Sequence, residues 1–470
     1  MITIAGSGLS GITSAWVGGG HDAGITNISD TLLNIAVPQD ATSGQIALGN
    51  GTHWAFSGSG FTVAGAAAPS SGSSGDPPSN SIAPPGGSSS SSAYSGGSSS
   101  SKSASGSSSL VVRVSGDHLV DASGNNLQLR GVNASGLEFV AVQGWSPADP
   151  WGGQAPSWSA IKSWKANAVR IPLNEASWLG YTCADSSGAT RNPDPGANYR
   201  STVSKTVADA TAAGLYVILD LHWTAPRTYC PLDQNPMADI DHSVAFWSSV
   251  ASTYKGYSNV LLELFNEPFV GYGGPVSQAD WSIIMQGGTQ SYYITGGNPY
   301  QVNYTWQVAG MQQMLNAVRA TGATNVVLIG TPSWAQDLSL WSANVPSDPL
   351  RQIAVVWHAY PNTNSPSETT PKLGTIAYTW AATILAAGYP IVISETGDHN
   401  SSGTVGAPYL AILLPWADAH DVSYLGWGWD VWQDSDNVLI KDSAGTPTDG
   451  YGVYFRQHLI CRGGGAGSCP

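Results

Sequence analysis

The stretch Val260-Leu261-Leu262-Glu263-Leu264-Phe265-Asn266-Glu267-Pro268 decides the fold of this chain. Its apolar run is typical of a strand that is buried on both faces of a parallel sheet, and the run ends in an Asn-Glu pair. A second strand of the same kind, Pro390-Ile391-Val392-Ile393-Ser394-Glu395, also ends in a glutamate. Because active sites of α/β barrels lie at the C-terminal ends of their strands, the two glutamates predict one shared site.

Working outward from these two strands, apolar segments and helical patterns alternate along the chain. The strand candidates are residues 127–132, 168–173, 216–222, 260–265, 326–330, 353–357, 391–394 and 422–427. Amphipathic stretches between them include residues 202–213, 243–254, 308–321 and 376–387. Eight strands that alternate with helices predict a (β/α)8 TIM barrel over residues 110–470. A short hairpin within residues 111–121 is expected to close the barrel floor.

The chain ahead of the barrel divides into two parts. Residues 69–109 are Ser, Gly and Pro with almost nothing apolar, which predicts a flexible linker. Residues 1–68 contain short β-type segments separated by turns, which predicts a small all-β, immunoglobulin-like sandwich. The string Ile4-Ala5-Gly6-Ser7-Gly8-Leu9-Ser10, together with residues 35–38 and 61–63, resembles the IPT/TIG domains of extracellular proteins. The resemblance implies an accessory domain.

Composition excludes several classes of function. The 470 residues carry a net charge of -14, so no basic stripe is present for phosphate and nucleic acid is not an expected partner. No run approaches the ~18–20 apolar residues of a membrane span. Trp and Tyr number 19 each against 7 Phe, a bias that suits stacking on sugars. We expect a secreted monomer, although residues 1–6 lack the features of a signal peptide.

Four cysteines occur, with no spacing typical of a metal site: Cys183, Cys230, Cys461 and Cys469. Three pairings are formally possible. Cys183 and Cys230 follow neighbouring predicted strands, so we expect them to pair, and Cys461 with Cys469 would close a small C-terminal loop. Such bridges fit an exported protein. His, Asp and Glu are too scattered in the sequence to indicate a catalytic metal site, so we expect neither a metal nor another cofactor.

Polar and aromatic residues stand at the ends of six predicted strands, and a barrel would bring them together. In chain order they are Arg170, His222 with Trp223, Asn266 with Glu267, His358 with Tyr360, Glu395, and Trp427 or Trp429. The set resembles glycoside hydrolase family 5 over residues 127–460. The shared motifs are Val169-Arg170-Ile171-Pro172, Asp220-Leu221-His222, Phe265-Asn266-Glu267-Pro268, His358-Ala359-Tyr360, Ser394-Glu395 and Gly426-Trp427-Gly428-Trp429.

The resemblance implies different catalytic roles for two carboxyl groups. Glu267 would be the general acid/base, protonated near neutral pH, and Glu395 would be the ionised nucleophile of a retaining β-glycosidase. A retaining mechanism predicts carboxyl groups ~5–5.5 Å apart, whereas about 9 Å would indicate inversion. The remaining residues would keep Glu395 charged, contact the sugar or line its pocket: Arg170, Tyr360, Asn266, His222, Trp223, His358, Trp427 and Trp429.

The substrate is less well defined by the sequence than the reaction. Segments 133–138 and 173–180 resemble the cellulase branch of the family, which favours an endo-β-1,4-glucanase. An exo-acting β-glycosidase and a mannanase remain alternatives, as does a non-catalytic carbohydrate-binding protein. The long segment 269–306, rich in Tyr and Trp, is expected to be a loop that walls or caps the cleft. A second Asn-Glu pair, Asn174-Glu175, is expected at the rim of the cleft.

Overall fold

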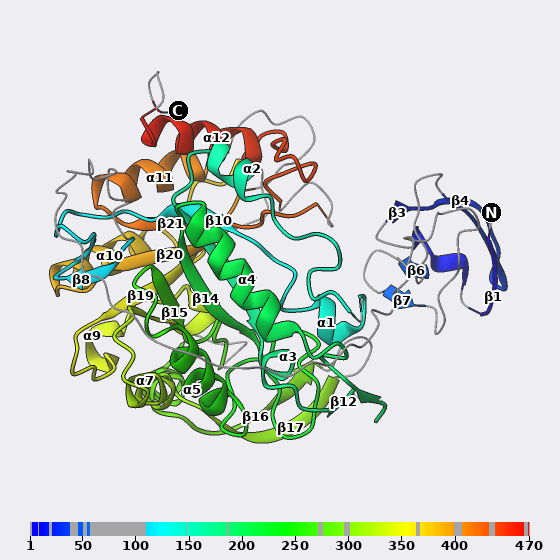
Figure 1. The fold of residues 1–470 in the computed structure, drawn as a ribbon, viewed down its shortest axis with the longest axis horizontal. Coiled ribbons are helices and arrows are strands. Elements are labelled where there is room, and N and C mark those ends of the chain that lie inside the picture. The colour runs from blue at the N-terminus through cyan, green and yellow to red at the C-terminus, as the bar shows by residue number, and fades with distance from the viewer. Residues whose placement is uncertain are drawn as a thin grey trace, which may run out of the picture.

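The structure of the protein is a computed structural model, and it describes part of the chain. The described residues are 2–7, 9–17, 21–37, 46–49, 54–56, 110–146, 148–185, 188–270, 276–295, 301–362, 367–398, 407–431, 438–464 and 469. Figure 1 shows the strands of the large unit at its centre, with helices packed around them.

Eight parallel strands form a closed barrel, as the sequence predicts. They are β10 (Arg130–Asn133), β11 (Ala168–Asn174), β14 (Tyr216–Trp223), β15 (Val260–Glu263), β18 (Val327–Ile329), β19 (Ile353–Ala359), β20 (Ile391–Thr396) and β21 (Ser423–Gly426). Neighbours in the chain are neighbours in the barrel, and β10 pairs with β21 to close it. All eight predicted strands are confirmed, and their residues are buried except for the half-buried Arg130 and Trp223, as expected for parallel strands covered on both faces.

Helices surround the barrel in the described part of the chain (Figure 1). They are α1 (Val140–Gln143), α2 (Trp158–Ser163), α3 (Glu175–Leu179), α4 (Tyr199–Ala212), α5 (Ser243–Tyr254), α6 (Gln278–Gln286), α7 (Met311–Ala320), α8 (Pro332–Ala335), α9 (Trp341–Asn344), α10 (Ile376–Ala386), α11 (Leu410–Ala419) and α12 (Tyr451–Arg462). On α4, Val203, Val207 and Ala210 are buried at helical spacing. They belong to one core cluster with Val169 and Ile171 of β11, so this face of the strand packs on helices.

The other face of each strand points into the barrel, where a second apolar cluster fills the N-terminal end. Ala168, Ile218 and Leu261 belong to it, and so do Val112 and Leu119 from outside the barrel strands. Leu119 lies on β9 (His118–Val120), which pairs with β8 (Arg113–Ser115). The expected hairpin is therefore confirmed, and its apolar side chains cover the barrel floor.

The segment expected to be a long loop, residues 269–306, is largely regular structure. It contains α6, which begins with a capping box at Ser277. The hairpin of β16 (Gly288–Thr295) and β17 (Gln301–Val308) follows. Trp281 and Trp306 are 0% and 3% exposed, so they fill the core and cannot stack on a sugar. The prediction that this segment is a loop is therefore wrong where α6, β16 and β17 lie. A separate two-stranded sheet of β12 (Cys183–Ala184) and β13 (Thr190–Arg191) lies in the chain between β11 and β14.

The N-terminal residues form two antiparallel sheets. One contains β1 (Ile2–Ala5), β5 (Leu32–Ala36) and β4 (Gly24–Ile28), and the other contains β3 (His21–Asp22), β2 (Ser14–Val17), β6 (Ile46–Gly49) and β7 (Trp54–Phe56). A 3-10 turn, Leu9–Gly11, follows β1. Ala15, Leu33 and Leu48 come from both sheets and share one apolar cluster, as in a sandwich. The likeness to IPT/TIG domains stays a prediction, and the expected linker, residues 69–109, lies outside the described residues.

Both expected disulfides are present. Cys183 pairs with Cys230, and Cys461 pairs with Cys469. Among the described residues, no helix has the length and apolar character needed to cross a membrane.

Candidate active site

Arg170 lies at the centre of the polar end of the barrel. It shares the inward face of β11 with Ala168 and is fully buried. Its guanidinium contacts three carboxylates: Asp220 at 3.0 Å, Glu263 at 2.9 Å and Glu395 at 2.7 Å. Burial alone would lower the pKa of Arg170, but the three negative charges outweigh burial and raise it. Arg170 is therefore a permanent cation among strand-end carboxylates.

Glu395 is oriented by a bulge in β20. The pairing of β20 with β19 and with β21 shifts its register around Ser394 and Glu395. Because of this bulge, these two consecutive residues both contact polar groups inside the barrel. Ser394 Oγ donates to Glu263 Oε1 at 3.0 Å. Glu395 Oε1 accepts from Arg170 Nη1 at 2.7 Å, and its Oε2 accepts from the Tyr360 hydroxyl at 3.1 Å. One oxygen of the expected nucleophile therefore contacts a cation, and the other accepts a hydrogen bond from a hydroxyl.

Glu267 lies across from Glu395 on the connection that follows β15. Its Oε2 accepts from Gln234 Nε2 at 2.7 Å, and its Oε1 accepts from His358 Nδ1 at 2.8 Å. His358 Nδ1 is also 3.6 Å from Glu395 Oε2. A carboxylate oxygen of Glu267 and one of Glu395 lie within 4.8 Å of each other. This upper limit lies below the ~6.5–9.5 Å spacing of inverting glycosidases, and it is compatible with the ~5–5.5 Å spacing of retaining ones.

His358 stabilises the charged form of Glu267. Burial would lower the pKa of His358, but the charge of Glu395 and hydrogen bonds to Glu263 and Glu267 raise the pKa to about 10. Burial would in turn raise the pKa of Glu267, but the hydrogen bond and charge of His358 outweigh it, so the pKa of Glu267 is lowered. The lowered pKa of Glu267 does not fit the expectation that Glu267 is protonated near neutral pH, because a buried imidazolium stabilises the carboxylate.

His222 and Asn266 form a second set of contacts beside the carboxylates. His222 Nδ1 lies 2.6 Å from Asp220 Oδ2, and its Nε2 lies 3.4 Å from Asn266 Nδ2. Burial lowers the pKa of His222, so the neutral ring donates from Nδ1 to Asp220 and accepts at Nε2 from Asn266. Asn266 Oδ1 accepts from Arg170 at 2.8 Å. Trp427 stacks parallel to His222, with ring centroids 5.6 Å apart.

One expected site residue, Trp429, takes another position. Trp429 is 4% exposed and packs edge-on against Trp164, with ring centroids 4.8 Å apart, so the structure gives it a packing role in the core. Trp223 lies against the Cys183–Cys230 disulfide and beside Phe139. The expectation that Glu175 lies at the rim is wrong, because its carboxylate is fully buried.

Five polar residues of the site were not assigned from the sequence: Asn133, Asp220, Gln234, Glu263 and Ser394. Glu263 was the easiest to find, because it interrupts an otherwise apolar strand and has the inward parity of Leu261. Asn133 Oδ1 accepts from Arg170 at 3.0 Å. Gln234 had no signal, since it lies in an irregular connection.

Two groups of described residues bring three potential metal ligands together. One is Glu267, His358 and Glu395, which the ion pairs above account for. The other is Glu175, Asp239 and His242. His, Asp and Glu are scattered along the sequence, yet folding brings some of them together. Their spacing in the sequence therefore did not predict these two groups.

A (β/α)8 barrel with an Asn-Glu pair after the fourth strand and a glutamate on the seventh defines the class of barrel glycosidases. Residues 120–434 match the cellulase family, glycosyl hydrolase family 5. The chain belongs to this family.

Relatives are consistent with that assignment. An endoglucanase of Clostridium saccharobutylicum is 25% identical over 72% of this chain and 61% of its own length. Endoglucanase 5 of Pectobacterium carotovorum subsp. carotovorum is 24% identical over 74% and 55%. The chain thus spans between about half and two thirds of these relatives. A β-glucanase of Saccharophagus degradans, in complex with cellotetraose, has the same fold, with a TM-score of 0.52 at 21% identity over 76% of this chain and 94% of that chain.

Proposed function

We propose that this protein is a retaining endo-β-1,4-glucanase that cleaves its substrate by double displacement. The observation that carries the proposal is the approach of Glu267 and Glu395, whose carboxylate oxygens lie within 4.8 Å. This spacing leaves no room for a water molecule between the sugar and the second carboxylate, as inversion would require. The two groups also differ in environment, because Arg170 contacts Glu395 and His358 contacts Glu267.

In the first step, a carboxylate oxygen of Glu395 attacks the anomeric carbon while the bond to the glycosidic oxygen breaks. Glu267 gives its proton to that oxygen, and the shortened chain leaves as an alcohol. The charge on Glu395 disappears as the glycosyl ester forms. Arg170 and the Tyr360 hydroxyl hold the carboxylate in position for attack.

In the second step, the carboxylate of Glu267 takes a proton from water, and the water oxygen attacks the anomeric carbon. The ester bond to Glu395 breaks, and the configuration of the sugar is restored. Asn266 is placed to bond the sugar 2-hydroxyl, since Arg170 holds its Oδ1 and leaves its Nδ2 beside His222. The Trp427 ring provides an apolar surface for the sugar.

The names of the relatives support β-1,4-glucan as substrate, since two of them are endoglucanases. An exo-acting β-glycosidase and a mannanase are the alternatives within the family. A panel of cellulose, mixed-linkage glucan, mannan, xylan and aryl β-glycosides separates them. Long products early in the reaction indicate endo cleavage, whereas release of terminal sugars alone excludes it.

The disulfides support export of the protein. We also propose a division into an accessory β-sandwich (1–68), a linker (69–109) and a catalytic barrel (110–470), acting as a monomer. Deletion of residues 1–109 should leave hydrolysis of a soluble substrate unchanged. A loss of hydrolysis with an intact barrel would contradict this division.

The reaction is tested with an aryl β-glycoside that has a good leaving group. Glu395→Ala should abolish hydrolysis, and added azide should yield an α-glycosyl azide, because azide replaces the missing nucleophile. Glu267→Ala should still form the glycosyl-enzyme, since this leaving group needs no acid, and azide should then yield the β-azide. Asp209→Asn, on the exposed surface of α4, is the control and should act like the wild type. Hydrolysis that persists in Glu395→Ala would contradict the mechanism, and a wild type without activity would favour a binding protein.

A further inference from the structure

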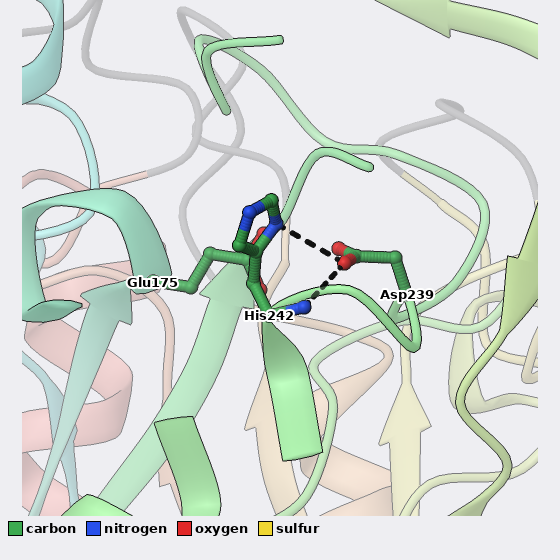
Figure 2. A group of neighbouring side chains, drawn as sticks. All are labelled: Glu175, Asp239 and His242. Carbon is green, nitrogen blue, oxygen red and sulfur yellow. Dashed lines mark hydrogen bonds and ion pairs between the residues drawn. The ribbon is translucent and has the colours of Figure 1, made fainter. Parts of the chain in front are cut away.

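Three ionisable side chains from two segments meet in a buried cluster that the proposed reaction does not use. Glu175 begins α3, directly after β11, whereas Asp239 and His242 lie just ahead of α5. His242 Nδ1 lies 3.2 Å from Asp239 Oδ1 and 3.8 Å from Glu175 Oε1. Figure 2 shows the Asp239 carboxylate pointing at the His242 ring, with Glu175 behind the ring. We call Glu175, Asp239 and His242 the α3–α5 cluster.

The cluster is held in place by bonds to the surrounding backbone and hydroxyl groups. The backbone N–H of Ala225 and the hydroxyl of Ser243 donate to the two oxygens of Glu175, each at 2.8 Å. The backbone N–H of His242 donates to Asp239 Oδ1 at 2.9 Å. The Tyr181 hydroxyl also donates to Glu175 Oε1, at 3.4 Å. These bonds fix both carboxylates, and Glu175 Oε2 and Asp239 Oδ2 keep lone pairs for a further partner.

One ligand atom in the cluster has no partner. Asp239 is fully buried, and among the described residues no group donates a hydrogen bond to its Oδ2. Glu175 is also fully buried, so two carboxylates lie side by side in the interior. A buried carboxylate without a compensating charge is costly, and His242 alone does not balance two of them.

We propose that the α3–α5 cluster binds one divalent transition-metal ion, with Zn²⁺ as the best match. Ligands would come from His242 Nδ1, one oxygen of Glu175 and one of Asp239. Imidazole with carboxylates is a donor set of zinc and related metals, whereas Mg²⁺ and Ca²⁺ prefer oxygen alone.

The two distances to His242 Nδ1 fit such an ion, and all three ligand atoms lie within 4.8 Å of one another. Zn²⁺ with tetrahedral bonds of ~2.0–2.2 Å separates neighbouring donors by roughly 3.3–3.6 Å. The separations of 3.2 Å and 3.8 Å from His242 Nδ1 bracket this range. The carbonyl oxygen of Ala225, 3.2 Å from Nδ1, is a candidate for the fourth position. The side chain of His242 is 18% exposed, so an ion can reach the cluster from solvent.

The ion would have a structural effect near the active site. It would join the start of α3 to the connection between β14 and α5, which begins after Trp223. The same connection carries Gln234, whose side chain donates to Glu267 at 2.7 Å. Cys230, in the disulfide with Cys183, holds the connection at another point. Metal binding would therefore stabilise the segment that positions Gln234.

The test measures metal content and thermal unfolding of the full-length chain, without any activity readout. After treatment with a chelator and dialysis, the wild type should bind one Zn²⁺ per chain in calorimetry, and its Tm should rise. Asp239→Asn and His242→Gln should each weaken binding by at least about 100-fold, more than the loss of an outer-shell partner. Ca²⁺ should produce no comparable rise in Tm. His242→Gln carries the test if Asp239→Asn does not fold, because His242 is the least buried member.

Two controls separate this site from others. Glu267→Gln removes a ligand from the second three-residue group, and it should still bind one Zn²⁺. His118→Gln alters a half-exposed histidine that also lies near two carboxylates, Asp117 and Asp421, and it should bind as the wild type does.

Three results would overturn the proposal. One is a wild type that binds no Zn²⁺. Another is an ion that is lost in Glu267→Gln and kept in His242→Gln. The third is an Asp239→Asn variant that is more stable than the wild type with or without Zn²⁺, which would show that Glu175 and Asp239 share a proton. None of them depends on the hydrolytic reaction.

Discussion

Arg170 and Glu263 form a bidentate ion pair inside the barrel. Arg170 Nε donates to Glu263 Oε2 and Nη2 donates to Oε1, both at 2.9 Å, and neither side chain is exposed. The pair holds the guanidinium at the angle from which its Nη1 reaches Glu395. Glu263 is therefore a positioning residue, because it acts on Glu395 through Arg170.

Replacing Glu263 with Gln should destabilise the protein by about 3–5 kcal/mol, because it removes one partner of a buried ion pair. Chemical denaturation measures the free energy of unfolding. The control is Lys205→Ala, which breaks the exposed Lys205–Asp209 pair on α4 and should cost less than about 1 kcal/mol. Equal losses in the two variants would contradict a special role of the buried pair.

Removing the hydroxyl of Tyr360 should slow the reaction with little effect on binding. Tyr360 donates to Glu395 Oε2 at 3.1 Å, and a hydrogen bond to a charged group contributes about 1.5–3 kcal/mol. Tyr360→Phe should therefore lower kcat about 10- to 100-fold while KM stays close to the wild-type value. Tyr257→Phe alters an exposed tyrosine and is the control. A rise in KM at constant kcat would show that Tyr360 binds substrate instead.

The pH dependence of activity should follow from His358. As the general acid, Glu267 must be protonated, and His358 lowers its pKa, so the alkaline limb of kcat/KM should lie at a lower pH than an unperturbed glutamate would give. His358→Gln removes the positive charge, which should raise the pKa of Glu267 and move the alkaline limb to higher pH. The pH at which the alkaline limb of the kcat/KM profile falls measures this shift, and this pH can be read even if the variant has a lower maximal rate. An alkaline limb at the wild-type position would contradict it.

Stability should also depend on pH through His358. Its pKa is raised from 6.5 to about 10 in the folded protein, so the folded state binds the proton more tightly than the unfolded state. The resulting stability is fully present below pH 6.5 and is lost as pH rises toward 10. Denaturation of the wild type between pH 6.5 and 10 should show the decline, and His358→Gln should flatten it. An equal slope in both proteins would assign the decline to other groups.

The two disulfides should differ in their effect on stability. Cys183–Cys230 closes a loop of 47 residues and Cys461–Cys469 a loop of 8. In the chain-entropy account, the longer loop contributes about 4 kcal/mol and the shorter about 2.5 kcal/mol. Replacing each pair with alanine and measuring unfolding under oxidising conditions tests the order. A greater loss for the C-terminal pair would contradict the entropic account.

Much of the fold could be predicted from local patterns. The apolar runs of β14 and β20 identify buried parallel strands because both of their faces lie against protein. The segment 269–306 was misjudged, since a capped helix and a hairpin with buried Trp281 and Trp306 look in sequence like a long aromatic loop. Trp429 was misplaced for a similar reason, because a tryptophan at a strand end can face the site or the core.

The sequence by itself determined the barrel and the positions of Glu267 and Glu395 at its strand ends, because these depend on patterns along the chain. Tertiary structure decided which charges meet. The bulge in β20 turns Glu395 toward Arg170, and His358 makes Glu267 more acidic than expected. Glu175 and Asp239 are 64 positions apart and meet because the segments after β11 and β14 pack together. Electrostatic interactions act through space, so their partners are set by packing between segments and not by position along the chain.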